Sequence, residues 1–175
     1  MTRNLTSTEL KRLHRDWRRR TDGRLAVILD GVQGPFNVGS IIRTAAAERI
    51  DHLWYSAGAT TAENTKVGKT ALGTDRYLTS SVTGTTVAAI NEAQAQGYQV
   101  IGIELAETAV ALPELELSGD ICLVIGHEDR GMAKDAMDAC NVLGFIPQLG
   151  KVGSLNVATA ASIAIYEVRR RSWTA

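Results

Sequence analysis

The hydrophobic positions of this chain fall into short apolar runs that alternate with segments of helical periodicity. The runs of strand length predict β-strands at residues 24–30, 52–56, 77–81, 98–105, 120–126 and 142–146. The segments with apolar residues three and four positions apart predict helices at residues 7–20, 37–48, 66–72, 85–96, 133–140 and 155–171. Strands that alternate with helices indicate one α/β domain, with a mostly parallel sheet and helices on both faces.

The first predicted helix has a narrower apolar surface than the others. Its apolar side chains form one stripe, which consists of Leu10, Leu13 and Trp17. We expect Thr6 or Ser7 to cap this helix, and we expect the helix to lean on the body by the stripe and leave its arginines free. We therefore divide the chain into a basic helical extension, residues 1–23, and a main domain, residues 24–175.

The composition is that of an ordinary globular protein. The 175 residues are 45% hydrophobic and 22% charged, and their formal net charge is zero. No apolar run approaches the ~18 residues that a membrane-spanning helix needs. The arginine-rich N-terminus lacks the apolar stretch of a secretory signal, so we expect a cytoplasmic protein.

The cysteine content gives no indication of metal or disulfide chemistry. Cys122 and Cys140 lie in apolar surroundings and are too few for a zinc site or a disulfide framework. We expect both to be small buried side chains, and we expect no metal site.

Positive charge is concentrated near the two ends of the chain. Residues 3–24 contain eight basic and three acidic side chains, and Arg169, Arg170 and Arg171 stand near the other end. Charge alone leaves two interpretations open, which are contact with a polyanion such as a nucleic acid and an ordinary solvated helix face.

The loop after the first predicted strand is the first place to look for chemistry, because parallel sheets bind ligands at the carboxyl ends of their strands. Residues 31–36 lack the G-x-G-x-x-G spacing, which argues against a dinucleotide-dependent oxidoreductase. Asn37 stands at or near a helix start, where an asparagine is most often a cap. Arg43 interrupts a segment of small and apolar residues, and an enclosed arginine there needs an anionic partner such as a phosphate.

Later loops contain two more polar clusters. The turn IGHEDRGM, residues 125–132, exposes its backbone between two glycines. His127 is of a type that serves acid–base catalysis, but without a nucleophile nearby we favour a merely exposed loop histidine. In the loop at residues 146–156 the simplest role of Ser154 is to cap the last helix, whose small residues suit close packing against another helix or a second subunit. We expect the loop at residues 104–108 to border a pocket formed by these two clusters.

Three segments, in order along the chain, resemble the motifs of the SpoU/TrmH branch of the SPOUT RNA methyltransferases. They are NVGSIIRTA at residues 37–45, LVIGHEDRGM at 123–132 and IPQLGKVGSLNVATAASIAIYE at 146–167. The resemblance implies an α/β fold with a deep C-terminal trefoil knot, and a homodimer. It also implies transfer of a methyl group from S-adenosylmethionine to the 2′-oxygen of a ribose in RNA, without a metal ion.

Within that family the sequence is most similar to the tRNA (guanosine-2′-O-)-methyltransferases that modify the D-loop. The basic first helix and the stretch at residues 66–77 carry this similarity. The segment after the third motif is shorter than in those tRNA enzymes, which keeps ribosomal RNA as an alternative substrate. A catalytically inactive RNA-binding module is an alternative of a different class, although the motif residues are all present.

The resemblance also implies roles for single residues. Catalysis is assigned to Arg43, Asn37, Glu128, Ser154 and Asn156. Binding of S-adenosylmethionine is assigned to Leu105, Gly126, Ile146, Ser154 and Leu155. The charge pattern of the first helix assigns RNA binding to Arg15, Arg18, Arg19 and Arg20. An arginine with a pKa above ~12 is a poor base. We therefore expect Arg43 to hold an RNA phosphate that accepts the ribose proton, with stabilisation of the developing alkoxide as the alternative.

Overall fold

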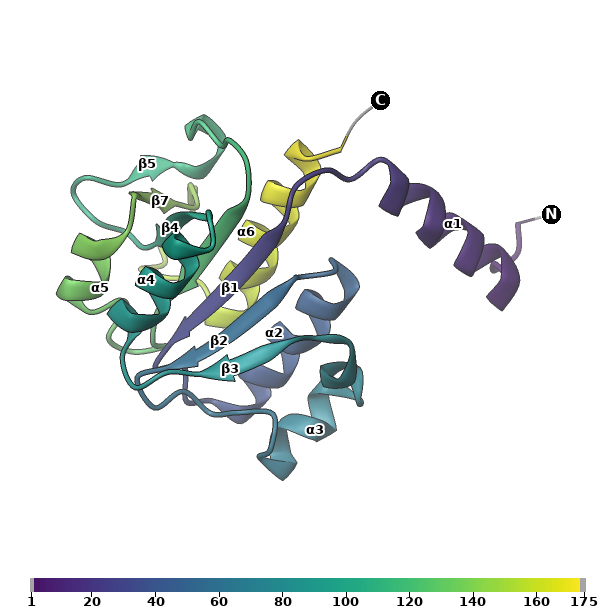
Figure 1. Cartoon of the computed structure of the whole chain (residues 1–175), viewed down its shortest axis with the longest axis horizontal. Coiled ribbons are helices and arrows are strands. Elements are labelled where there is room, and N and C mark those ends of the chain that lie inside the picture. The colour runs from purple at the N-terminus through teal and green to yellow at the C-terminus, as the bar shows by residue number, and fades with distance from the viewer. Residues whose placement is uncertain (1, 174–175) are drawn as a thin grey trace.

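A computed structural model describes residues 2–173 of the chain, and in this part the strands form a single seven-stranded sheet (Figure 1). The strands are β1 (Leu25–Asp30), β2 (His52–Ser56), β3 (Ser80–Val82), β4 (Gln99–Ile103), β5 (Val110–Ala111), β6 (Ile121–Ile125) and β7 (Val142–Phe145). Their order in the sheet is β3-β2-β1-β6-β4-β7-β5, and every pair of neighbours is parallel. The prediction of an α/β fold with a parallel sheet is confirmed.

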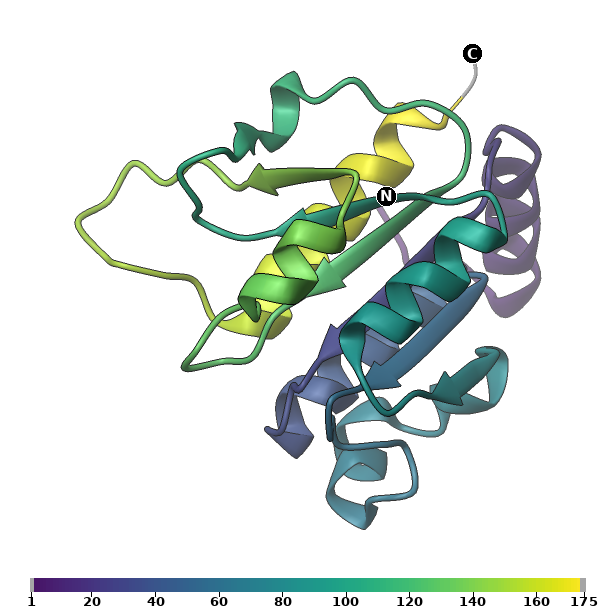
Figure 2. The same cartoon turned by 60° about the vertical axis from the view of Figure 1, so that its left-hand side comes forward.

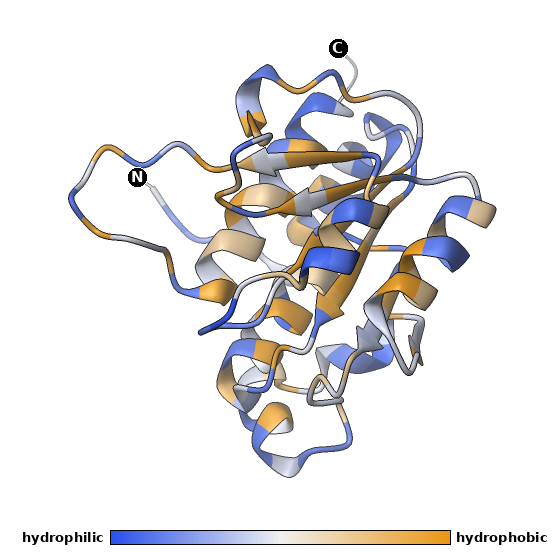
Figure 3. Cartoon of the chain, turned by 90° about the vertical axis from the view of Figure 1, so that its left-hand side faces the viewer, coloured by the Kyte–Doolittle hydropathy of each residue, from blue (hydrophilic) through white to orange (hydrophobic). Residues whose placement is uncertain are grey.

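Helices cover both faces of this sheet, as the sequence predicts. They are α1 (Ser7–Arg19), α2 (Pro35–Ala47), α3 (Thr65–Ala71), α4 (Thr86–Ala95), α5 (Lys134–Ala139) and α6 (Val157–Arg171), with short 3₁₀ turns η1 (Thr74–Tyr77) and η2 (Leu112–Glu114). Alternate residues of β1 point to opposite faces. Leu25 and Val27 join the core beneath α2, α3 and α6, whereas Ala26 and Ile28 join the core beneath α4 and α5 (Figure 2). Figure 3 shows the apolar residues gathered in the strands between these layers.

The strand order places the later loops at one edge of the sheet. β6 lies between β1 and β4, and β7 lies beyond β4, so the carboxyl ends of β4, β6 and β7 stand side by side. The long loop from β7 to α6 extends away from the sheet beside these ends (Figure 2). Strand order alone does not test the trefoil knot, which stays a prediction.

Several predicted boundaries were wrong for local reasons. Tyr77, predicted as the first residue of a strand, is the last residue of η1, and β3 begins only at Ser80. Leu72 and Gly73 adopt left-handed backbone between α3 and η1. Helix α2 begins at Pro35, two residues early, since proline suits the first helical position. Strand β5 and the turn η2 were not predicted, because they are too short to produce a periodic pattern.

Helix α1 does not lean on the body as expected. Leu10, Leu13 and Trp17 are 42%, 41% and 41% exposed, and no residue of the helix is buried. Trp17 contacts the end of the chain through Trp173, and the two ring centroids lie 4.8 Å apart. Figure 1 shows the helix standing away from the sheet. Thr6 caps it in a capping box, so the first of the two predicted caps is confirmed.

The arginines near the end of α6 make hydrogen bonds and ion pairs within the fold. Arg169 is buried and donates hydrogen bonds to three backbone carbonyl oxygens that follow α2 or precede β1. Arg171 donates to two carbonyl oxygens at η2, and Arg170 pairs with Glu167. In contrast, the arginines of the N-terminal helix α1 are exposed to solvent.

None of the helices within residues 2–173 is long and apolar enough to cross a lipid bilayer. The division of the chain at residue 23 stays a prediction, and the predicted domain end at residue 175 lies outside the described residues.

Candidate functional site

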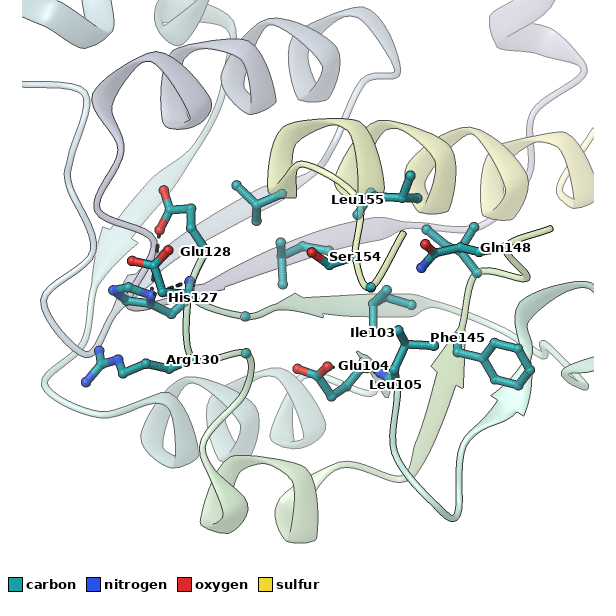
Figure 4. Close-up of a pocket in the computed structure, with 18 residues that line it drawn as sticks. Ile103, Glu104, Leu105, His127, Glu128, Arg130, Phe145, Gln148, Ser154 and Leu155 are labelled. Carbon is teal, nitrogen blue, oxygen red and sulfur yellow. Dashed lines mark hydrogen bonds and ion pairs between the residues drawn. The ribbon is translucent and has the colours of Figure 1, made fainter. Parts of the chain in front are cut away.

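A cavity of about 370 Å³ opens at the carboxyl ends of β4, β6 and β7 (Figure 4). Its two ends differ in chemistry. One end carries apolar side chains, including Leu105 and Phe145, and the other carries His127, Glu128 and Arg130. An elongated cavity of this size suits a small molecule with one apolar end and one charged end.

The five residues predicted to bind the methyl donor all line this one cavity. They come from separate loops and are Leu105, Gly126, Ile146, Ser154 and Leu155. The fold therefore brings together residues that are up to 50 positions apart in sequence. Their role in binding a donor stays a prediction.

A chain of hydrogen bonds joins the three motifs next to the cavity. The Asn156 Nδ2 atom donates to Asn37 Oδ1 at 3.0 Å, and Asn37 Nδ2 donates to Glu128 Oε1 at 3.2 Å. Asn37 lies on α2, Glu128 follows β6, and Asn156 precedes α6. We call these three residues the amide–carboxylate bridge, because it fixes the loop after β6 against both helices.

Glu128 is an acceptor in this bridge. Burial raises the pKa of its carboxyl, but hydrogen bonds from its own backbone, the Asn37 side chain and the backbone N–H groups of Gly34 and Gln33 outweigh burial. The net pKa lies below the ordinary value, so the group is ionised at neutral pH. An ionised carboxylate that already accepts these bonds is suited to positioning the loop and not to donating a proton.

The two predicted helix caps near the site were assigned to the wrong residues. Asn37 lies inside α2, where the residue at the cap position is Gly34, so the amide of Asn37 is free for the bridge. Asn156, not Ser154, caps α6, with its Oδ1 accepting from the backbone of Ala158 and Thr159. Ser154 is left exposed in the wall of the cavity.

Of the five predicted catalytic residues, Glu128 and Ser154 line the cavity, and Asn37 and Asn156 are joined to it through the bridge. Arg43 has neither connection. It lies on the outward face of α2, is exposed, and is absent from the cavity wall. Its neighbour Thr44 faces α6 instead, where its hydroxyl lies 3.0 Å from that of Ser162. Arg43 therefore points to solvent on the outer surface that α2 and α6 share.

His127 is not the merely exposed histidine that we expected. The residue is half-buried, and its Nδ1 accepts a hydrogen bond from the Asp129 backbone at 3.0 Å. The Glu128 Oε2 atom lies farther from the same nitrogen, at 3.9 Å. The imidazole thus closes the turn between β6 and α5.

Glu104, which was not predicted as a site residue, braces the cavity floor. Its Oε1 accepts from the Leu105 backbone at 2.9 Å and its Oε2 from the Met132 backbone at 2.8 Å. Gly131 has a φ of +66°, and a Cβ at this position would overlap the Glu104 carboxylate. The sequence signal that could have identified Glu104 is its position as a charged residue at the end of an otherwise apolar predicted strand.

Neither cysteine is suited to nucleophilic chemistry. Cys122 is buried, and Cys140 is half-buried instead of fully buried as expected. Burial raises the pKa of Cys122 well above its ordinary value and that of Cys140 to about 12. Within residues 2–173, no group of three or more His, Cys, Asp or Glu side chains is placed to hold a metal ion.

Comparison with known proteins gives consistent similarities. Residues 24–166 match the model of the SpoU rRNA methylase family. The 23S rRNA (guanosine-2′-O-)-methyltransferase RlmB of Xylella fastidiosa is 34% identical over 149 residues, which cover 85% of this chain and 59% of the relative. The AdoMet-bound rRNA methyltransferase structure from Sinorhizobium meliloti has a TM-score of 0.81 and 28% identity, and the match covers 89% of this chain and 59% of that one.

A third similarity is to a structure described as showing the 2′-OH methylation of C/U34 on tRNA. It has a TM-score of 0.75 and 27% identity, and covers 85% of this chain and 96% of that one. This chain spans about three fifths of the length of the curated relatives it matches, 58% and 59% for two of them. Because the family match extends over most of the chain and through all three motifs, the chain belongs to the SpoU rRNA methylase family.

Proposed function

We propose that this protein transfers the methyl group of S-adenosylmethionine to the 2′-oxygen of a ribose in structured RNA. The observation that carries the proposal is one cavity lined by residues of the second and third motifs, with an apolar end and a charged end, to which the first motif is joined through the hydrogen bond from Asn37 to Glu128. S-adenosylmethionine has the same division, with a flat adenine at one end and a charged amino acid at the other. The AdoMet-bound relative and the relatives named for RNA methylation support this reading.

The charge of the cavity fits a cationic sulfonium. Among the described residues that line it, three carry carboxylates, Glu104, Glu128 and Asp129, against the guanidinium of Arg130. An excess of carboxylates repels the phosphates of a dinucleotide and attracts a positively charged ligand. The same imbalance argues against an oxidoreductase that uses a dinucleotide.

The chain's own residues hold and orient the reactants. When bound, S-adenosylmethionine would supply an activated methyl group on its sulfonium for transfer to the ribose oxygen, with the thioether S-adenosylhomocysteine as the leaving group. The amide–carboxylate bridge and the cavity wall fix the reacting geometry, which is the main requirement of an in-line transfer. Arg43 holds an RNA phosphate, whose oxygen accepts the proton that leaves the 2′-hydroxyl.

A homodimer brings Arg43, which does not line the cavity of its own chain, to the cavity of the partner. Arg43 lies on the outward face of α2, and the adjoining outward face of α6 carries Ile163 and Tyr166, which are 40% and 50% exposed. Apolar side chains on an otherwise polar helix face suit contact with a second copy. Burying this face between two copies carries Arg43 toward the cavity of the partner.

A second part of the proposal concerns which RNA is methylated. The resemblance of the first helix and of residues 66–77 to D-loop enzymes favours a tRNA guanosine. The 34% identity to a 23S rRNA guanosine methyltransferase favours ribosomal RNA as the second candidate. Both candidates share the same ribose chemistry at the same cavity.

Methyl transfer to RNA is tested with the purified chain, a labelled methyl donor, and separate tRNA and 23S rRNA transcripts. We expect label in one of the two RNAs, in a dinucleotide that survives alkaline hydrolysis because its 2′-oxygen is blocked. Label on a base would contradict ribose methylation. Binding of the donor without any transfer to either RNA would favour the inactive RNA-binding module.

The exposed arginines of α1 and its C-terminal cap are expected to contribute RNA affinity without chemistry. They are Arg15, Arg18, Arg19 and Arg20, of which the last also lies 5.5 Å from the Trp17 ring. Changing all four to Ala should weaken RNA binding, and the slope of log K against log salt should fall by about 0.7–0.9 for each phosphate that the variant no longer neutralises. Binding of S-adenosylmethionine should stay unchanged in calorimetry. The matched control changes the same four residues to Lys, which keeps the charge and should keep the slope; an unaltered slope in the Ala variant would make α1 a solvated helix face.

A further inference from the structure

A buried carboxyl group at the end of β1 takes no part in the cavity wall. Asp30 is 5% exposed and does not line the cavity, although β1 is a direct neighbour of β6 in the sheet. Its Oδ1 accepts a hydrogen bond from the Thr86 hydroxyl, and its Oδ2 accepts from the Ala133 backbone N–H at 3.2 Å. Burying a carboxyl group is unfavourable unless it is hydrogen-bonded, so these two contacts are the place to look for its role.

The contact to Thr86 belongs to a buried cluster of polar side chains. Thr86 is the first residue of α4, and its hydroxyl lies 2.9 Å from that of Ser56 at the end of β2. The Ser56 hydroxyl in turn donates to the Leu29 carbonyl oxygen at 2.9 Å. This cluster joins β1, β2 and α4 inside the core, and neither hydroxyl lines the cavity. It accounts for one oxygen of Asp30 and leaves the other to be explained.

The contact to Ala133 holds the loop between β6 and α5. We call residues 126–133 the cavity loop, because its members from Gly126 to Gly131 line the cavity. Ala133 occupies the cap position of α5 and offers this helix no side-chain cap. The second oxygen of Asp30 therefore fixes the end of the cavity loop to the strand beside it.

The two arms of the cavity loop lie against each other. The backbone N–H groups of His127 and Gly131 each donate to the carbonyl oxygen of the other residue, at 3.1 and 2.9 Å. A Cβ on Gly126 would lie only 2.6 Å from the Met132 backbone nitrogen, so these two backbone segments are in close contact. Because Met132 directly precedes Ala133, a shift of Ala133 is passed on to the cavity wall at Gly126.

The residue after Asp30 supports the same loop from below. Gly31 has a φ of +67°, and a Cβ there would lie 3.8 Å from His127 Cδ2 and 3.9 Å from Arg130 Nη2. The end of β1 thus contacts the cavity loop near its start, in its middle and, through Asp30, at its end.

Asp30 adds a third carboxyl group to two that also hold the cavity loop. Glu104 accepts from the loop at Met132, and Glu128 of the loop itself accepts from the Gly34 backbone ahead of α2. Both of these glutamates line the cavity, whereas Asp30 supports the loop from the core.

We propose that Asp30 is a positioning residue that sets the shape of the cavity through the Ala133 backbone. Its carboxyl group touches no ligand. It holds the second arm of the cavity loop, and through that arm Gly126, where a bound molecule needs the wall to be. The consequence for donor affinity rests on the proposed function, whereas the consequence for the loop itself does not.

The hydrogen bond is tested by removing it from either side. Asp30→Ala removes the acceptor. Ala133→Pro removes the donor and keeps the backbone, since Ala133 has a φ of −65°, the value that proline adopts. In both variants we expect amide hydrogen exchange at His127 and Gly131, followed by NMR on the full chain, to be at least about tenfold faster. The Kd of S-adenosylmethionine in calorimetry should be at least about tenfold higher.

Two controls separate positioning from a general loss of stability. Ser56→Ala removes a hydroxyl from the same buried cluster without touching Asp30 or the cavity loop. It should lower the melting temperature by about 2–6 °C and leave the exchange rates and the Kd within about twofold of the parent. In Asp30→Asn the amide oxygen accepts from Ala133 and the amide N–H donates to Thr86, whose hydroxyl is then free to donate to Ser56. This variant should match the parent in both measurements.

The outcomes differ for the two proposals. Exchange or affinity that stays like the parent's in folded Asp30→Ala and Ala133→Pro would overturn the role of Asp30, and melting curves show which variants are folded. A Ser56→Ala variant that changes the loop as much, or an Asp30→Asn variant that behaves like Asp30→Ala, would overturn it as well. A parent that binds no S-adenosylmethionine would contradict the proposed function, and faster exchange in the two variants would then still support the positioning of the loop by Asp30.

Discussion

Replacing Arg43 with Ala is expected to lower the rate of methyl transfer at least about 10³-fold. Affinity for S-adenosylmethionine should stay within about twofold of the parent, because Arg43 does not line the cavity of its own chain. Since the residue is exposed on α2, the melting temperature should also stay close to that of the parent. Single-turnover transfer, calorimetry and a melting curve on one preparation measure these quantities. A loss of donor affinity that matches the loss of rate would place Arg43 in donor binding and contradict its proposed contact with RNA.

Mixed dimers test whether Arg43 acts in the cavity of the partner. Arg43→Ala and Gly126→Ala chains, each expected to be inactive alone, are co-expressed with different tags. Homodimers of each variant and mixed dimers then form together. In a mixed dimer one intact cavity receives one intact arginine, so the unselected mixture should recover about a quarter of the parental activity. Activity no higher than that of the separate variants would contradict a shared site. Light scattering on the parent should give the mass of a dimer, twice 18.8 kDa.

Gly126→Ala is expected to abolish donor binding and to destabilise the fold. A Cβ at this residue would lie 2.6 Å from the Met132 backbone nitrogen and 2.7 Å from the Gly131 carbonyl carbon. Backbone atoms in a tight turn cannot move aside as a flexible side chain does, so the loop after β6 must shift. We expect a cost of about 2–3 kcal/mol, a melting temperature lower by about 5–10 °C, and donor affinity at least about 100-fold weaker.

Gly150→Ala is the matched control for this change. Gly150 lies in the loop between β7 and α6, and a Cβ there has no other heavy atom within 4 Å. Its melting temperature should stay within about 1 °C of the parent and its donor affinity within about twofold. If Gly126→Ala behaves like Gly150→Ala, the turn after β6 is not part of a donor site.

The layered fold was predictable because its signals are local. A run such as that of β1 is buried at every residue, and such a run in an alternating α/β pattern has few other interpretations. The cap of α1 was predictable for the same reason, since a threonine three residues before a glutamate is a sequence signature. Periodicity failed at η1 and β5, which contain too few residues to display a period.

The candidate site was predictable only where a resemblance supplied it. The five predicted donor-binding residues were assigned from the family resemblance, four of them within its motifs and Leu105 outside them, and the fold then placed them together. Glu104 was missed because its significance lies in what surrounds it, the two backbone N–H groups from which its carboxylate accepts hydrogen bonds. The role of Arg169 was missed because three arginines in a row look alike in sequence, and only burial distinguishes them.

The amide–carboxylate bridge has a consequence for how the protein is made. Its two bonds join residues that are 91 and 119 positions apart, so both close very large loops. Asn156 is the last of the three residues to be synthesised. Until then the Asn37 Oδ1 atom lacks the hydrogen bond that Asn156 donates to it. All strands of the described sheet, β7 included, have by then been synthesised, and contacts of such long range form late in folding. The bridge is therefore complete only after the start of α6 has been synthesised, and the candidate site of a nascent chain stays unfinished before that point.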